Sequence, residues 1–311
     1  PKPAYDVIVI GGGGHGLATA FYLAEEHGIR NVAVLERGLI GQGNTGRNTT
    51  IVRSNYILPQ NNNFYEHALK LWEGLEQSLN YNVMMSQRGV INLFHNDAQR
   101  NAALRRGNSM RLNGIDAEML DRDGVKAMCP IVDLDNGRYP VMGGLLQRRG
   151  GTARHDAVAW GFAHAADARG VDIIEQCEVT GMIVEGGAIQ GVRTTRGEIR
   201  APKVGLAVAG STSTLTEMAG FRVPIETHLL QAFVSEGLKP LIDCVVTFGA
   251  GHFYVSQSDK GGLVFGGGLD GYPSYGQRGT LREAEHVYAA GVSMIPALGR
   301  LRGLRSWAGV M

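Results

Sequence analysis

The chain has 311 residues, of which 44% are hydrophobic, and its 30 basic and 29 acidic residues leave a formal net charge of +1. This length suits one large domain or two of moderate size, and the balanced, interspersed charges exclude a nucleic-acid-binding or membrane-surface composition. With no apolar run of 18 residues and no signal-peptide pattern, the sequence predicts a soluble cytoplasmic protein that binds neither nucleic acid nor membrane.

The first predicted element is a β-strand over residues 5–10, and a glycine-rich turn leads from it into a predicted helix over residues 17–24. Gly11, Gly13 and Gly16 fit the spacing G-x-G-x-x-G. In this arrangement the first glycine permits a tight turn, the second lets backbone N–H groups approach a pyrophosphate, and the third lets helix and strand pack closely. The helix N-terminus adds a positive dipole end and free N–H donors.

Glu36 lies twenty residues beyond Gly16, at the end of a second predicted strand over residues 32–35. A carboxylate at this position accepts hydrogen bonds from ribose hydroxyls and repels a 2′-phosphate. Strand, glycine turn, helix, second strand and terminal acid together predict a dinucleotide-binding site. The alternative is a glycine-rich turn in an ordinary βαβ unit.

A small, polar and glycine-rich loop follows at residues 41–50, before the apolar Ile51 and Val52 and then Arg53. Its position close behind Glu36 favours a role in lining the rest of the dinucleotide with hydrogen-bond donors. The alternative is a flexible surface loop.

The next predicted helix, over residues 63–79, gathers its apolar residues on one face, at Phe64, Ala68, Leu71, Trp72, Leu75 and Leu79. We expect this face to pack in the core rather than against a partner. A strand over residues 90–94 and a polar helix from about 97 to 113 follow. Residues 114–146 contain prolines and several glycines, which predicts loops with one short helix near 121–128.

A second glycine-rich stretch, at residues 150–156, leads into a predicted helix that has Asp156 at its start and ends near Arg169. Short β-runs come next, at residues 171–175, 178–184, 189–195, 197–199 and 204–209. The last run ends in Ala209 and Gly210, which predicts that the chain returns there to the dinucleotide sheet. A helix near 212–219, strands at 225–236, 252–255 and 263–266, and a helix over 280–293 complete the predicted elements.

Three cysteines, Cys129, Cys177 and Cys244, are far apart in the sequence and match no metal-ligand spacing. We interpret them as reduced, buried thiols and expect no metal site.

These features resemble the glycine and D-amino-acid oxidase family of flavoproteins, and within it the β subunits of heterotetrameric sarcosine oxidases. The family features are the Gly-Gly-Gly-Gly-His-Gly turn at residues 11–16, the strand end at Glu36, the polar loop before Arg53 and the return strand ending in Ala209-Gly210. The similarity to the β subunits rests on residues 12–20, 47–56, 86–90, 153–156 and 275–279. It covers essentially the whole chain.

The resemblance implies an α/β fold, with a Rossmann-like FAD-binding domain and a β-rich substrate domain like that of D-amino-acid oxidases. We expect a discontinuous FAD-binding domain over residues 1–86 and 147–224, and a substrate domain over residues 87–146 and 225–307. Members of the family continue beyond the strand at Trp307, with a glycine-rich segment under the isoalloxazine ring and a lysine for the substrate carboxylate. The chain also starts at Pro1 and stops at Met311 inside a β-like run, so we expect a C-terminally incomplete fragment.

FAD is the first cofactor that the resemblance implies, bound non-covalently. Its pyrophosphate would lie across the turn formed by Gly11, Gly13, Gly14, His15 and Gly16, with Glu36 on the adenosine ribose. The residues that would approach the flavin end are Asn44, Arg47, Thr49, Thr50 and Ile51. Val179 would contact the adenine side through its backbone.

FMN is the second implied cofactor, attached covalently to His155 through the 8α carbon of the flavin. A histidine that is neutral near pH 7 is a suitable nucleophile for that carbon. Arg154 would steer the FMN phosphate or stabilise negative charge on the reduced ring, and His228 is a further candidate neighbour of FMN. Without the resemblance, His155 would be interpreted as a surface histidine at a helix start.

The implied reaction is oxidation of sarcosine or a related N-methyl amino acid. A hydride passes from the N-methyl carbon to FAD and gives an imine, FMN takes the electrons, and O₂ becomes H₂O₂. Arg53 is the candidate partner of the substrate carboxylate, although a structural salt bridge would also explain it, and Tyr254 is expected to line the pocket. The implied partners are the α, γ and δ subunits of a heterotetramer, a larger subunit among them passing the one-carbon unit to tetrahydrofolate.

Two other functions remain open from the sequence. The chain would be a simpler, single-flavin FAD-dependent amino-acid or amine dehydrogenase if no FMN is attached. It would be an inactive, truncated flavin-binding subunit if a complete site requires further residues.

Overall fold

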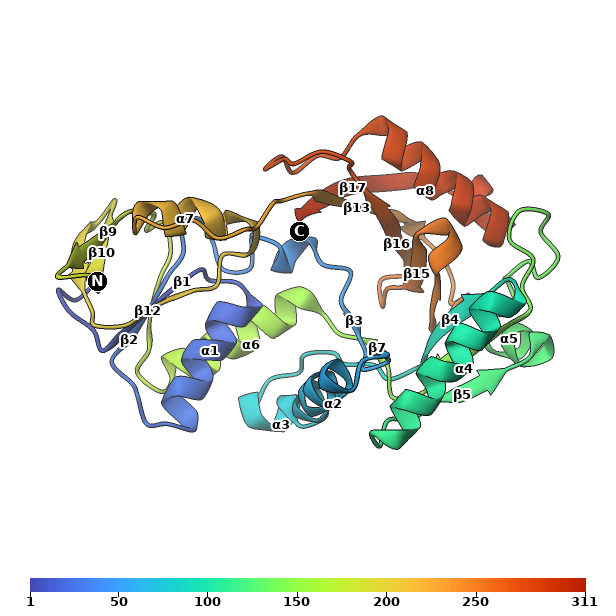
Figure 1. Cartoon of the computed structure of the whole chain (residues 1–311), viewed down its shortest axis with the longest axis horizontal. Coiled ribbons are helices and arrows are strands. Elements are labelled where there is room, and N and C mark those ends of the chain that lie inside the picture. Colours follow the sequence, from blue (N-terminus) through green and yellow to red (C-terminus); the bar gives the residue numbers. More distant parts are fainter.

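A computed structural model describes residues 1–311. Two sheets lie at opposite ends of an elongated molecule (Figure 1). One is a four-stranded parallel sheet with the order β12-β1-β2-β8, and the other is an eight-stranded mixed sheet with the order β17-β13-β16-β15-β14-β4-β6-β5. The site described below lies between them.

The parallel sheet consists of β1 (Val7–Ile10), β2 (Val32–Leu35), β8 (Asp172–Ile174) and β12 (Val204–Leu206). Every residue of β1 and β2 is buried and apolar, as expected for central parallel strands covered on both faces. Helices α1 (Gly14–Glu25) and α6 (His155–Asp167) pack together, with the rings of Phe21 and Phe162 5.7 Å apart. The opposite face packs on an antiparallel sheet of β9 (Val179–Glu185), β10 (Ala188–Thr194) and β11 (Gly197–Arg200).

The predicted return strand is confirmed, because β12 pairs in parallel with β1 after this antiparallel sheet. The chain then enters the short 3₁₀ turn η2 (Ala209–Ser211) and helix α7 (Thr212–Met218).

The large sheet is formed by β4 (Val90–Phe94), β5 (Glu118–Leu120), β6 (Gly143–Gln147), β13 (Leu229–Gly237), β14 (Val245–Phe248), β15 (Phe253–Gln257), β16 (Gly262–Leu269) and β17 (Gly303–Val310). Its strand pairs are antiparallel except β4 with β14. Helices α5 (Arg122–Met128) and α8 (Leu281–Met294) contribute to its core. The other elements of this part are η3 (Gly249–Gly251) and η4 (Pro296–Arg300).

Segments between the two sheets carry much of the site. They are η1 (Thr45–Arg47), the two-stranded ribbon of β3 (Ile51–Val52) with β7 (Gly151–Thr152), and helices α2 (Pro59–Glu73), α3 (Leu75–Leu79) and α4 (Asp97–Leu112). Figure 1 shows β3 and β7 in the middle of the molecule, above α2 and α3. The division into two discontinuous domains stays a prediction.

The prediction of loops over residues 114–146 was wrong in part, because this region contains β5 and β6 as well as the expected short helix. Glycines made β6 look like a loop. A Cβ on Gly143 would lie 2.4 Å from the Leu120 carbonyl oxygen, and one on Gly144 would lie 2.7 Å from the Ile91 side chain. These glycines therefore permit close strand packing rather than a turn.

The predicted core face of the helix at residues 63–79 was also wrong in part. The segment forms two helices, and Phe64 and Leu71 are 69% and 42% exposed. The buried positions of α2 include Asn62 and Glu66 instead, because Glu66 pairs with Arg149 beneath the helix. The three cysteines are buried and free, as predicted. No helix is both long enough and apolar enough to cross a lipid bilayer.

Candidate functional site between the two sheets

The turn between β1 and α1 adopts a conformation that requires glycine. Gly11 has φ +110°, and a Cβ there would lie 2.4 Å from the Ala207 carbonyl oxygen. A Cβ on Gly16 would lie 1.9 Å from the Gly11 carbonyl oxygen, so the helix packs directly on the turn. Gly13, which precedes helix α1, has no side chain to cap the helix, and the first turn contains no acidic residue. The positive end of the helix dipole is therefore available to phosphate groups.

Thr45 and Glu36 fix the surroundings of this turn. The Gly14 N–H donates to Thr45 Oγ1 over 2.9 Å, and a Cβ on Gly13 would lie 3.0 Å from the same hydroxyl oxygen. Glu36 Oε2 accepts from the Gly12 N–H and Oε1 from the Gly38 N–H, both over 2.8 Å. The carboxylate is thus held beside the glycine turn with lone pairs left for ribose hydroxyls.

Val179 lies near the same carboxylate. The Cys177 N–H donates to the Glu36 carbonyl oxygen over 2.9 Å, and Val179 begins β9 two residues later. The Val179 side chain is buried. The position therefore lies at the Glu36 end of the motif.

The loop at residues 41–50, which contains η1, is tied to the large sheet through Asn44 and Arg47. Asn44 Oδ1 accepts from the Val310 N–H over 2.9 Å. The Arg47 guanidinium donates to Gln277 Oε1 over 2.7 Å, and the Arg47 backbone carbonyl oxygen accepts from Trp307 Nε1 over 2.7 Å. Asn44 and Arg47 therefore connect the parallel-sheet half of the molecule to β17.

Thr50 has φ +58°, an unfavourable conformation for a β-branched residue. Such strain gathers at ligand sites. Thr49 and Thr50 line both cavities described below, while Ile51 lines the larger.

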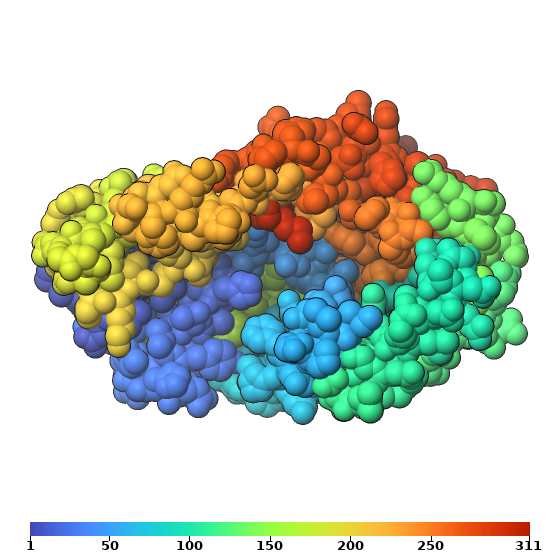
Figure 2. Space-filling model, in the orientation of Figure 1, coloured from blue at the N-terminus to red at the C-terminus, as the bar shows by residue number.

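A cavity of about 1330 Å³ runs from the glycine turn to the large sheet. Gly14 and His15 line one end, and Thr247 and Tyr254 line the other. Figure 2 shows a hollow in the middle of the molecule, between the blue N-terminal part and the orange and red C-terminal part. This larger cavity therefore joins the predicted dinucleotide site to the predicted substrate residues.

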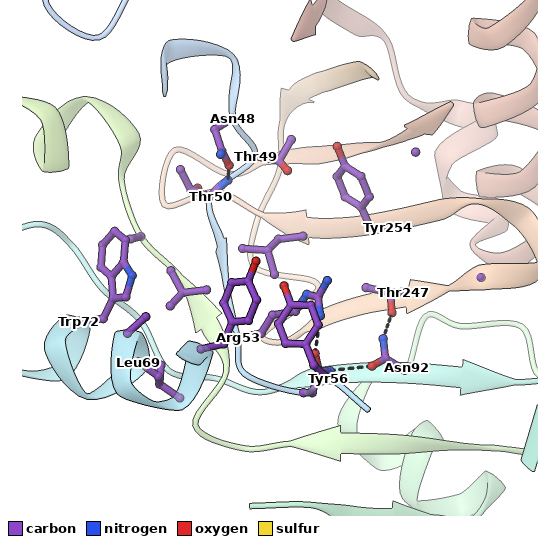
Figure 3. Close-up of a pocket in the computed structure, with 18 of the residues that line it drawn as sticks. Asn48, Thr49, Thr50, Arg53, Tyr56, Leu69, Trp72, Asn92, Thr247 and Tyr254 are labelled. Atoms are coloured by element: carbon purple, nitrogen blue, oxygen red, sulfur yellow. Dashed lines mark hydrogen bonds between the residues drawn. The ribbon is translucent and has the colours of Figure 1, made fainter. Parts of the chain in front are cut away.

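Arg53 lines this cavity with its guanidinium unpaired by any carboxylate within 4.0 Å, so the salt-bridge interpretation was wrong. Its Nη1 donates to Asn55 Oδ1 over 2.6 Å, and the group lies 4.6 Å from the centre of the Tyr56 ring. Figure 3 shows Arg53 beside Tyr56, with the Tyr254 side chain reaching toward Thr49. Burial raises the pKa of Tyr254, against a smaller effect of Thr49, so its phenol stays a hydrogen-bond donor near neutral pH.

A smaller cavity of about 1010 Å³ lies on the other side of the loop at residues 48–50. His155, the first residue of α6, lines both cavities. Burial lowers the pKa of His155, Asp156 opposes this effect, and the positive charges of Arg154 and Arg305 act with burial. The imidazole is therefore neutral near pH 7, as a nucleophile requires.

Arg154 lies in the same cavity but already has two acidic partners. Its guanidinium pairs with Asp156 over 3.0 Å and with Asp259 over 3.3 Å. Lys260 and Arg305 line the cavity without a carboxylate within 4.0 Å. These two cations are therefore better placed than Arg154 to meet a phosphate, and no sequence motif marks them.

His228 lies apart from both cavities. Its Nδ1 is 2.9 Å from the Asp270 carbonyl oxygen, and its backbone pairs with Met311. Neither cavity is lined by this residue. The structure therefore does not bring His228 to His155, and we leave it out of the proposed site.

Comparison with known proteins agrees with this geometry. The family model described as FAD dependent oxidoreductase matches residues 6–311. The chain belongs to the FAD-dependent oxidoreductase family. Two curated relatives, both named sarcosine oxidase subunit beta, are 69% identical over 311 residues (Rhizobium meliloti) and 51% identical over 312 residues (Arthrobacter sp.). The alignments cover 100% of this chain and 75% and 77% of those relatives.

Solved structures show the same fold. An L-proline dehydrogenase from P. horikoshii aligns with a TM-score of 0.92 and 27% identity over 100% of this chain and 82% of that one. A glycine oxidase from Geobacillus kaustophilus aligns with a TM-score of 0.87 and 19% identity, over 99% and 83%. The predicted FAD-dependent oxidoreductase fold and the resemblance to sarcosine oxidase β subunits are therefore confirmed.

Membership of the FAD-dependent oxidoreductase family explains the cradle between β1, α1 and Glu36, which fits FAD. It leaves open which residues act on the substrate. Two residues of the larger cavity were missed, Asn92 on β4 and Arg106 on α4. A polar residue inside the apolar run of residues 90–94 was a usable signal for Asn92, whereas nothing distinguishes Arg106 from its neighbour Arg105.

Proposed function

We propose that this chain is the flavin-bearing β subunit of a multi-subunit oxidase that oxidises sarcosine or a related N-methyl amino acid, with FAD in the larger cavity and FMN attached at His155. The relatives named sarcosine oxidase subunit beta support it. The observation on which the proposal mainly rests is that His155 lies on the wall shared by the two cavities. A group attached there would lie next to FAD.

The residues proposed to hold FAD form a continuous path. Gly11, Gly13, Gly14, His15 and Gly16 would receive the pyrophosphate at the helix N-terminus. Glu36 would bind the ribose, and Val179 the adenine side. Thr49, Thr50 and Ile51 would lie along the flavin, with Asn44 and Arg47 holding their loop against β17.

The residues proposed for the substrate lie at the far end of the cavity. When bound, FAD would supply the hydride acceptor for oxidation of the substrate's N-methyl carbon, and FMN would supply the route for the electrons to O₂, with H₂O₂ as the product. Arg53 binds the substrate carboxylate and so orients that carbon. Tyr254 donates a hydrogen bond into the cavity, and the apolar lining excludes water.

His155 is proposed as the attachment point for FMN because its ring is neutral and half-buried. Positive charge around His155 comes from Arg154, Lys260 and Arg305. The cation nearest the FMN phosphate would stabilise bound FMN. The products would be glycine, H₂O₂ and either formaldehyde or methylene-tetrahydrofolate. The partners would be α, γ and δ subunits.

Acid precipitation of the purified protein tests the attachment. We expect yellow flavin to stay with the pellet in the wild type and to be lost in His155→Ala. His164→Ala is the matched control, because His164 is an exposed histidine of the same helix that lines neither cavity. Flavin that stays in the His155→Ala pellet would contradict the assignment.

Bleaching of the flavin on addition of sarcosine tests the substrate. The second candidate function is a single-flavin FAD-dependent dehydrogenase, which is supported by the likeness to L-proline dehydrogenase. It predicts that acid releases all flavin as FAD while an amino-acid substrate still bleaches it. If the protein holds flavin but none of the amino acids tested bleaches it, both enzyme functions would be excluded. That result would favour an inactive flavin-binding subunit.

A further inference from the structure

The larger cavity has an unusual charge. Among the 42 residues that line it there is no aspartate, glutamate or lysine, and the only permanently charged side chains are Arg53 and Arg106. Neither arginine has a carboxylate within 4.0 Å. Two cations in a mostly apolar cavity are unfavourable unless an anion joins them. The unpaired charge therefore points to a negatively charged ligand.

A chain of amide side chains connects the two guanidinium groups. Arg53 Nη1 donates to Asn55 Oδ1 over 2.6 Å, and Asn55 Nδ2 donates to Asn92 Oδ1 over 2.7 Å. Arg106 Nη1 lies 3.5 Å from the same Asn92 oxygen. Arg106 therefore approaches Asn92 directly, whereas Arg53 is linked to it through Asn55, and each arginine has most of its N–H donors unused.

The fold holds this arrangement in place. Asn92 Nδ2 donates to Thr247 Oγ1, its partner in the parallel pairing of β4 with β14, and Figure 3 shows the two residues facing each other. Asn55 is fully buried. On α4, Gly107 follows Arg106, and a Cβ at Gly107 would lie 3.2 Å from the Leu145 side chain, so a glycine lets the helix approach the sheet. Burial lowers the pKa of Arg106, and the charge of Arg53 acts in the same direction, as expected for neighbouring cations.

We propose that Arg106 is a second carboxylate-binding residue, and that Arg53 and Arg106 together clamp one carboxylate group of the substrate, one guanidinium on each oxygen. Asn92 sets the distance between them. The inference rests on the proposed function, because it concerns the same site, and it narrows the substrate class to amino acids with a free carboxylate. Amines, amides and esters would leave two cations without a partner.

Calorimetric titration of the FAD-loaded chain with acetate tests the clamp, with acetamide as the uncharged probe of the same shape. We expect Arg106→Gln to weaken acetate binding about ten- to a hundredfold, because it removes a charge-assisted contact. Acetamide binding should not change. Arg106→Lys should recover part of the acetate affinity, and Arg105→Ala, an exposed neighbour on α4, should match the wild type.

A second variant covers the case in which Arg106→Gln does not fold. Asn92→Asp adds a carboxylate between the two arginines, so we expect it to fold and to lose acetate binding at least tenfold. Acetate affinity that is unchanged in Arg106→Gln, or reduced equally for acetate and acetamide, overturns the clamp. So does an Asn92→Asp protein that binds acetate as the wild type does.

The test of the clamp can fail independently of the test of the proposed function, because calorimetry measures acetate binding without any catalytic turnover. If acetate binding depends on Arg106 but sarcosine does not bleach the flavin, the clamp stands and the proposed substrate is wrong. If sarcosine bleaches the flavin and Arg106→Gln binds acetate normally, the proposed function stands and the clamp is wrong.

Discussion

The two cavities share a wall at His155 but differ in how their charges are paired. The larger contains two arginines and no acidic residue. The smaller is lined by four cations and four acids, namely Arg88, Arg154, Lys260, Arg305, Glu76, Asp156, Asp243 and Asp259. In the smaller cavity Arg88 and Arg154 have acidic partners at 4.0 Å or less, whereas in the larger neither cation has one.

This difference teaches that pairing, more than the number of charges, indicates where a ligand charge belongs. The pair of Arg88 with Asp243 joins side chains that are 60% and 80% exposed, and such surface pairs contribute little. Arg53 and Arg106 are half-buried and unpaired, which destabilises the free protein. A substrate carboxylate would remove that destabilisation on binding.

The largest effect is expected from Arg53→Ala, which removes the unpaired cation attributed to substrate binding. We expect the KM for sarcosine to rise about a hundredfold or more, because a charge-assisted contact to the substrate carboxylate is lost. Steady-state kinetics with O₂ uptake measure it. Arg88→Ala, a paired cation of the smaller cavity, should change KM less than about twofold. Similar KM values in the two variants would remove the distinction between paired and unpaired cations.

The dinucleotide part of the site could be predicted from sequence because its contacts are local. Gly11, Gly16 and Glu36 belong to one βαβ unit, so their spacing along the chain nearly determines their positions in space. The resemblance to a known family extended this to the fold and to FAD.

The rest of the site could not be predicted from the sequence, because it depends on contacts between segments that are distant in the chain. Asn55, Asn92 and Thr247 meet only because β4 pairs with β14, more than 150 residues later in the chain. The apolar pattern of residues 63–79 was misleading for a similar reason. The side of α2 that faces the protein holds the buried Glu66, and its partners Ser54 and Arg149 lie outside the helix.

Glu66 holds in place the segment that contains Arg53, at the wall of the larger cavity. Its replacement should have the next largest effect, on the free energy of unfolding. Its carboxylate accepts from Ser54 Oγ over 2.9 Å and pairs with Arg149 over 2.5 Å, which fixes the chain next to Arg53. We expect Glu66→Ala to lower the free energy of unfolding by about 3 kcal/mol, because Arg149 keeps a partly buried charge with one partner fewer. Urea unfolding measures it.

Glu73→Ala is the matched control for Glu66. Glu73 pairs with the same arginine over 2.8 Å, but its side chain is 31% exposed against 7% for Glu66. We expect this variant to lower the free energy of unfolding by about 1 kcal/mol or less. Equal losses would show that burial of Glu66 adds nothing to the support of the Arg53 segment.

The smallest effect is expected on the pKa of His155, which lies on the wall between the two cavities. Burial lowers the pKa of His155 while Asp156 raises it, so Asp156→Asn should lower it further. Attachment of FMN requires the neutral ring, and its rate should therefore fall as the pH drops through the pKa of His155. The rate of acid-stable flavin incorporation into flavin-free protein, followed against pH, should show a midpoint at lower pH in Asp156→Asn than in the wild type. An unchanged midpoint, or one at higher pH, would contradict the role of Asp156 in raising the pKa of His155.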